Sequence, residues 1–122
     1  MLFRSEPNGS VYEGEFKDGS FEGEGRYEWP DGKVYIGQWK SNKMHGTGTF
    51  TWPDGRRYTG EYIEDQKEGK GSFHWPDQKY YEGEWKQGKQ HGEGTLYPGP
   101  DRVGRKGLWR NGDRVRWLEE RQ

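Results

Sequence analysis

Aromatic and charged residues alternate along most of this chain. In segment 12–17 a tyrosine, a glycine and a phenylalanine occupy the even positions, whereas two glutamates and a lysine occupy the odd ones. Segment 22–29 alternates likewise, with two glycines, Tyr27 and Trp29 on one side and charged residues on the other. Successive side chains of a strand point to opposite faces, so this period predicts two β-strands. We expect them to form an antiparallel hairpin connected by residues 18–21.

The hairpin pattern returns every 23 residues, since the motif Tyr-x-Gly-x-aromatic starts at Tyr12, Tyr35, Tyr58 and Tyr81. Gly-x-Gly-x-aromatic and then Pro-Asp-Gly follow in the same register, with departures at Gln78, around residues 97–101, and at Arg105. A fixed period of this length indicates a repeat architecture. We expect one domain, 1–122, with these parts: a half repeat 1–11, repeats 12–34, 35–57, 58–80 and 81–104, and a terminal half repeat or cap 105–122.

The predicted fold class is all-β, an elongated, twisted single-layer antiparallel sheet of tandem β-hairpin repeats. Paired glycines in every repeat disfavour a helix, because each costs about 1 kcal/mol in a helix interior. They also allow a neighbouring ring to lie flat over the backbone. At about 4.8 Å per strand, nine or ten strands would extend roughly 45 Å.

The 23-residue period explains a composition that would otherwise indicate disorder. Hydrophobic residues make up 26% of the chain and charged residues 34%, which by itself is typical of disorder. However, aromatic residues make up 16%, and 21 residues are glycine. The core must therefore be aromatic. The residues expected on the aromatic face are Tyr12, Phe16, Tyr27, Trp29, Tyr35, Trp39, Phe50, Trp52, Tyr58, Tyr62, Phe73, Trp75, Tyr81 and Trp85.

Charge and residue types argue against several functions. The 20 basic and 21 acidic residues nearly balance, so we expect no nucleic-acid partner. The absence of cysteine removes disulfides and thiolate metal sites. His45, His74 and His91 have no ligand spacing or paired base and are interpreted as turn or solvent-face residues. The sequence therefore predicts no enzyme, no cofactor and no metal.

The combined motif resembles the MORN (membrane occupation and recognition nexus) repeat, and the resemblance covers about residues 7 to 112. It implies a curved sheet of hairpins with non-catalytic roles: scaffolding in ciliary, cytoskeletal and membrane-linked assemblies, and a groove that holds a partner peptide or helix. Phosphoinositide binding is a further property proposed for the family. Because no apolar run approaches the roughly 18 residues of a membrane span, we expect a cytoplasmic protein, with cytoskeletal, ciliary or membrane-peripheral placement as finer alternatives.

The main functional hypothesis is a protein-interaction scaffold. A single layer cannot cover its own aromatic face, and open apolar patches mark partner sites. The predicted partner-binding residues are Tyr35, Trp39, Tyr58, Tyr62, Tyr81 and Trp85.

Three alternatives remain open. The first is binding of anionic lipid by the basic C-terminal residues, which are Arg102, Arg105, Lys106, Arg110, Arg114 and Arg116. The second is self-association through open sheet edges, since the acidic N-terminal third and the basic C-terminal end differ in charge. The third is that the repeats form a regulatory fragment of a larger enzyme.

Overall fold

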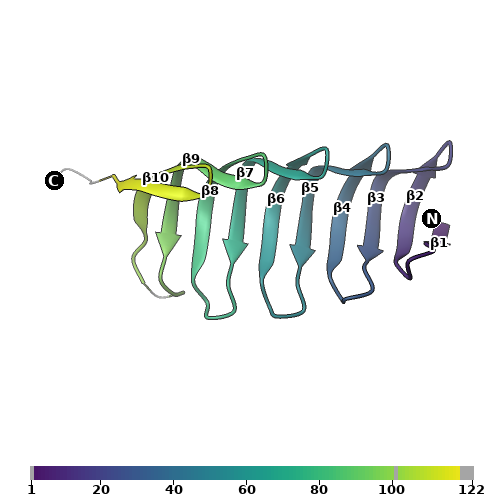
Figure 1. Ribbon diagram of the computed structural model, residues 1–122, viewed down its shortest axis with the longest axis horizontal. Coiled ribbons are helices and arrows are strands. Elements are labelled where there is room, and N and C mark those ends of the chain that lie inside the picture. The colour runs from purple at the N-terminus through teal and green to yellow at the C-terminus, as the bar shows by residue number, and fades with distance from the viewer. Residues whose placement is uncertain (1, 101, 119–122) are drawn as a thin grey trace.

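The computed structural model describes residues 2–100 and 102–118, which form one open sheet. Its strands follow one another in chain order, each antiparallel to the next. Figure 1 shows them side by side in a single layer along the long axis, with the two termini at opposite ends. The strands are β1 (Leu2–Ser5), β2 (Val11–Lys17), β3 (Ser20–Glu28), β4 (Val34–Lys40), β5 (Lys43–Thr51), β6 (Arg57–Ile63), β7 (Gln66–His74), β8 (Tyr80–Lys86), β9 (Lys89–Tyr97), β10 (Arg105–Arg110) and β11 (Asp113–Trp117).

The predicted fold class is confirmed, but the sheet has 11 strands, not nine or ten. Part of the difference lies at the N-terminus, where Leu2–Ser5 pairs with β2 although it lacks the paired glycines that marked the other strands. The predicted connection 18–21 was also too long. Only Asp18 and Gly19 form the turn, and Phe21 already lies in β3.

Two-residue turns close the hairpins. Asp18 and Gly19 both have positive φ, of 52° and 81°, and the same pair of positive angles recurs at the four later hairpin turns. Two successive positive φ values define the type I′ turn, whose twist matches that of the strands. The connections that follow β3, β5 and β7 share the pattern Trp-Pro-Asp-Gly. Gln78 replaces the last glycine in one of them, yet it adopts φ 76° and donates its backbone N–H to Trp75 O at 3.0 Å, as glycine does elsewhere.

A bulge interrupts each repeated hairpin. Between β2 and β3, Gly14 pairs with Gly25 and Phe16 with Phe21, so Glu15 alone faces residues 22–24. The Glu15 carboxylate accepts the backbone N–H of Glu24 at 3.2 Å. Equivalent side chains at positions 38, 61 and 84 accept the corresponding N–H in the next repeats. The bulge thus shifts the register and turns Phe21 toward the same face as Tyr12.

The first tyrosine of each repeat lies flat over a pair of glycines. Tyr35 is 0% exposed, and a Cβ placed on Gly48 would overlap its ring. Its hydroxyl donates to the backbone oxygen of Gln38 at 2.9 Å, within the bulge. Tyr12, Tyr58 and Tyr81 repeat this arrangement, with hydroxyl–carbonyl distances of 2.8 to 3.0 Å. The ring thereby takes the space that side chains fill in other sheets, while its polar group is satisfied.

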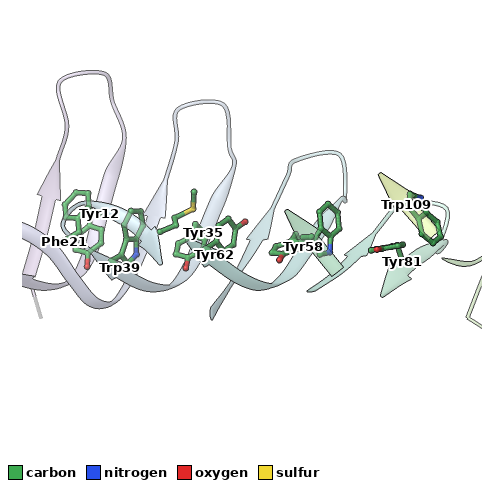
Figure 2. Packing of buried hydrophobic residues seen from close by; sticks show 10 residues of the cluster. Tyr12, Phe21, Tyr35, Trp39, Tyr58, Tyr62, Tyr81 and Trp109 are labelled. Atoms are coloured by element: carbon green, nitrogen blue, oxygen red, sulfur yellow. The ribbon is translucent and has the colours of Figure 1, made fainter. Parts of the chain in front are cut away.

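An upright ring stands between successive flat tyrosines. Trp39 meets Tyr12 and Tyr35 edge-on at ring-centroid distances of 5.6 and 5.1 Å. We call the whole chain of edge contacts, with centroid distances of 5.0 to 5.6 Å, the aromatic spine. Figure 2 shows much of it as a row along the sheet. Its members in spatial order are Phe16, Tyr12, Trp39, Tyr35, Tyr62, Tyr58, Trp85, Tyr81 and Trp109.

Replacing a glycine beneath a flat tyrosine should be strongly destabilising. Gly48→Ala places a methyl group where the Tyr35 ring lies, and we expect the free energy of unfolding to fall by at least about 2 kcal/mol. Gly99→Ala is the matched control, because its Cβ would come no closer than 3.5 Å to Arg102 Cγ. Urea denaturation of the two variants would measure the difference. Equal stability of both would contradict the proposed role of the glycine pair.

The buried tyrosines predict a loss of stability in alkali. Burial, assisted by the charges of Glu15 and Glu84, raises the pKa of Tyr12 and of Tyr81 from 10.0 to about 12. Burial also raises the pKa of Tyr35, Tyr58 and Tyr62. In the unfolded chain these hydroxyls ionise near pH 10, whereas the folded protein retains their protons.

Stability from these groups is therefore complete below about pH 10 and is lost as the pH rises toward and beyond 12. We expect the urea midpoint to decrease from about pH 10 upward, with tyrosinate absorbance appearing in the same transition as unfolding. A midpoint that stays constant between about pH 9 and pH 11 would show that the hydroxyls are not held in this way.

Candidate functional site

A second line of aromatic rings lies beside the spine and is only half buried. We call it the open aromatic row, and its members are Tyr27, Trp29, Phe50, Trp52, Phe73 and Trp75. Consecutive ring centroids in the row are 4.5 to 5.5 Å apart. The row packs against the spine, for example through Tyr27 and Trp39 at 5.8 Å. The open aromatic row is therefore a continuous apolar surface that is held in place by the buried rings of the spine.

Cations lie over the rings of this row. Lys33 Nζ is 5.8 Å from the Trp29 ring centroid, and Arg56 Cζ is 5.1 Å from that of Trp52. Both cations are also paired with a carboxylate of their own turn, Lys33 with Asp31 at 3.4 Å and Arg56 with Asp54 at 2.8 Å. Backbone and side-chain hydrogen bonds from Lys33 and Arg56 lower the pKa values of these aspartates. Lys33 and Arg56 are thus neutralised by local partners, whereas Lys79 Nζ, 4.9 Å from the Trp75 ring centroid, has no carboxylate oxygen within 4.0 Å among the described residues.

The six predicted partner-binding residues all belong to the spine, and the structure buries them. Tyr35, Tyr58 and Tyr81 are 0% exposed, and Trp39, Tyr62 and Trp85 are 3 to 7% exposed. Figure 2 shows Tyr35, Trp39, Tyr58, Tyr62 and Tyr81 within this packed row. They lie beside the open aromatic row, which packs against them. The sequence placed both lines on one face without distinguishing the row as the more accessible part. Whether a partner contacts the six stays a prediction.

One column of the repeat did not emerge from the sequence. It contains Phe21, Met44, Lys67 and Gln90, which are 23 residues apart. Phe21 stacks on Tyr12 with ring centroids 3.8 Å apart, and Met44 is buried. The predicted loop 18–21 hid this column, because it assigned Phe21 to a connection. Aligning the four repeats position by position would have exposed the change from apolar to polar residues.

The two ends of the aromatic face are covered by arginines. At the N-terminal end, Arg4 Cζ lies 4.5 Å from the Phe21 ring centroid. At the C-terminal end, Arg105 replaces the flat tyrosine, and Trp117 lies opposite Gly107, where the other repeats have a second glycine. The Trp117 ring is flanked by Arg105 at 4.1 Å and Arg114 at 4.5 Å. This exchange of tyrosine and glycine for arginine and tryptophan closes the spine.

The basic C-terminal residues are exposed but do not form one patch. Arg105 and Arg114 contact Trp117 on the aromatic face. Lys106 and Arg110 alternate with Arg105 along β10 and so lie on the opposite, outer face. Arg116 pairs with Leu108 and shares that outer face, while Arg102 lies in the preceding loop.

All three histidines lie in strands and not in turns, and two of them contact neighbouring residues. His74 stacks on Tyr80 at 4.9 Å on the outer face, and Tyr80 stacks on Tyr97 at 4.4 Å. Burial and the charge of Arg57 lower the pKa of His74. In β9, His91 Nδ1 accepts the backbone N–H of Asn111 at 3.4 Å. His45 lies half-buried in β5.

Within residues 2–100 and 102–118, no group of three or more His, Cys, Asp or Glu side chains is placed to hold a metal ion. Over the same ranges, no helix has the length and apolar character needed to cross a membrane.

One open sheet that adds a hairpin every 23 residues, with tyrosines laid over paired glycines, defines a β-repeat protein built from a single layer. The sequence model of the MORN repeat matches residues 12–34, 35–56, 58–80 and 81–98, together more than half of the chain. The chain belongs to the MORN repeat family, as its motifs indicated. A comparison with curated proteins gave no match. Membership of this family indicates a repeat module for interaction with proteins or membranes.

Proposed function

We propose that this MORN array is a non-catalytic scaffold that holds a peptide or helix of a partner protein against the open aromatic row. The observation that supports this most directly is the division of the aromatic face into two lines. Eight of the nine spine rings are buried, all but Phe16, whereas the six rings of the row remain half-buried. Large aromatic side chains that are held in place by neighbouring residues are typical of interface hot spots.

The length of the row favours a short partner segment. Trp29, Trp52 and Trp75 follow alternate strands, β3, β5 and β7, so the row extends across about four strand spacings, or roughly 19 Å. A helix of about 13 residues has that length at its rise of about 1.5 Å per residue. The proposed role of Tyr35, Trp39, Tyr58, Tyr62, Tyr81 and Trp85 is to support the neighbouring rings of the row and to contact any partner side chain that reaches between those rings.

The MORN repeat family is generally non-catalytic, and we propose no reaction for this chain. Its proposed setting is cytoplasmic, in a ciliary or cytoskeletal assembly where an elongated module can join other proteins.

Removing two tryptophans of the row should abolish partner capture without unfolding the sheet. The probe is a displayed library of random peptides about 16 residues long, long enough to cover the row. We expect peptides selected on the natural protein to bind Trp52→Ala/Trp75→Ala at least about tenfold more weakly, because hot-spot truncations cost more than about 1.4 kcal/mol. Fluorescence polarisation of the synthesised peptides would measure this.

Tyr97→Ala is the matched control, since Tyr97 is a half-buried aromatic residue of the outer face. Circular dichroism of each variant would establish that the strands persist. If the affinity of the selected peptides falls with Tyr97→Ala and not with the double tryptophan variant, the binding surface lies on the outer face. That result would contradict the proposal.

A second candidate function is recognition of an anionic membrane by the outer face of the C-terminal hairpin. Lys106, Arg110 and Arg116 are exposed there together. Each basic residue near an anionic surface contributes about 1 kcal/mol. Replacing all three by alanine should therefore lower partitioning onto vesicles that contain phosphatidylserine and phosphoinositide by roughly 100-fold. Flotation would measure it, with the exposed lysines Lys17, Lys40 and Lys43 replaced together as control. An equal effect of both triple variants would indicate net charge alone.

A further inference from the structure

Lys67 occupies a position that two other repeats fill with buried apolar residues. Its counterparts Phe21 and Met44 are 3% and 9% exposed. The Lys67 side chain points into the same face, where its Nζ lies 5.7 Å from the ring centroid of Trp52, 5.4 Å from that of Tyr58 and 5.7 Å from that of Trp85. The ammonium group thus sits among three rings, one from the open aromatic row and two from the spine.

Within the part of the chain that the structure describes, the Lys67 ammonium group has no acidic partner. Among residues 2–100 and 102–118, no carboxylate oxygen comes within 4.0 Å of Lys67 Nζ. Its situation differs from that of Lys33 and Arg56, which each have an aspartate of their own turn. Burial and the charge of Arg56 lower the pKa of Lys67.

The turn that lies over Lys67, formed by Gln87 and Gly88, contains no carboxylate. In the preceding repeat, Asp65 contacts the strand at Met44, where its backbone N–H donates to Met44 O at 3.0 Å and its Oδ1 accepts the Met44 N–H at 2.8 Å. One repeat later, Gly88 makes the backbone contact to Lys67 O at 3.0 Å but has no side chain. An aspartate at position 88 would have placed a carboxylate at the Lys67 backbone N–H, as Asp65 does at Met44.

We propose that the partner segment carries an aspartate or glutamate whose carboxylate pairs with Lys67 Nζ, with apolar side chains of the same segment on the neighbouring rings of the open aromatic row. This inference rests on the proposed function and adds the chemistry of the partner to it. Cation–π contact with three rings holds the ammonium group in place, and a charged hydrogen bond formed away from water is stronger than one at the surface. Lys67 is then the residue that selects an acidic-apolar segment over a purely apolar one.

The test uses the full chain and the same random peptide library. Peptides selected on the natural protein should contain Asp or Glu at one shared position. Lys67→Met, which copies Met44 of the preceding repeat, should weaken their binding by about ten- to hundredfold, the equivalent of one charged hydrogen bond. Lys67→Arg should retain most of the affinity. The matched control is Lys70→Met, because Lys70 is exposed and belongs to the outer face.

A double-mutant cycle then assigns the contact. Changing the shared acid of the peptide to its amide should weaken binding to the natural protein as much as Lys67→Met does, and should have little further effect on Lys67→Met. Peptides selected afresh on Lys67→Glu should carry Lys or Arg at that position. Thermal unfolding of Lys67→Met should show at least the stability of the natural protein, which separates lost recognition from lost folding.

The two proposals fail differently. If selected peptides require Trp52 but contain no shared acid and bind Lys67→Met as well as the natural protein, the pairing with Lys67 is wrong and the partner surface stands. If no peptide requires Trp52, the partner surface itself is wrong, and the pairing falls with it. If Lys67→Met weakens flotation with anionic vesicles but not peptide binding, the carboxylate partner is overturned in favour of a lipid.

Discussion

The flat packing of a tyrosine over two glycines is the constraint on which this sheet depends. A single layer has no second sheet or helix to cover its apolar face, so the cover must come from its own side chains. Tyr12, Tyr35, Tyr58 and Tyr81 are fully buried because the glycine pairs beneath them leave room for the rings. Each hydroxyl reaches a bulge carbonyl, so the ring is fixed at both ends. A chain with only 26% hydrophobic residues can fold in this way, because each buried ring contributes a large apolar area.

This solution separates stability from recognition. The upright rings of the spine connect one flat tyrosine to the next, so burial is propagated along the sheet by contacts between neighbouring repeats, as expected for a quasi-one-dimensional array. The open aromatic row lies beside the spine and packs on it through contacts such as Tyr27 with Trp39. Its rings can therefore remain partly accessible without exposing the core. A binding surface of this kind can change its residues while the flat tyrosines stay in place.

The sequence predicted the period, the strands and the aromatic face, because all three depend on residues close together in the chain. Tyr12, Gly14 and Phe16 share a face through the period of two alone. The sequence did not predict the bulge opposite Glu15, since it arises from a register shift between two strands. It missed the burial of Phe21 for the same reason. The hydrogen bonds of Asn42 with Phe21 connect adjacent repeats and leave no mark in either repeat by itself. For the site, the correct face was identified, but the division into spine and open row needed the packed structure.

Departures from the repeat fall into two kinds, and the difference bears on function. Gln78 replaces a turn glycine but keeps its positive φ and its hydrogen bond. Arg105 replaces a flat tyrosine, and Trp117 compensates by occupying the opposite glycine position, with the arginine stacked on it. The chain itself accommodates both changes, so neither needs a partner to explain it. The change to Lys67 has no compensating residue of this kind, because Gly88 of the overlying turn has no side chain. A partly buried ammonium group with no carboxylate within reach among the described residues, at a position that two other repeats fill with apolar side chains, is best explained by a group that another molecule supplies.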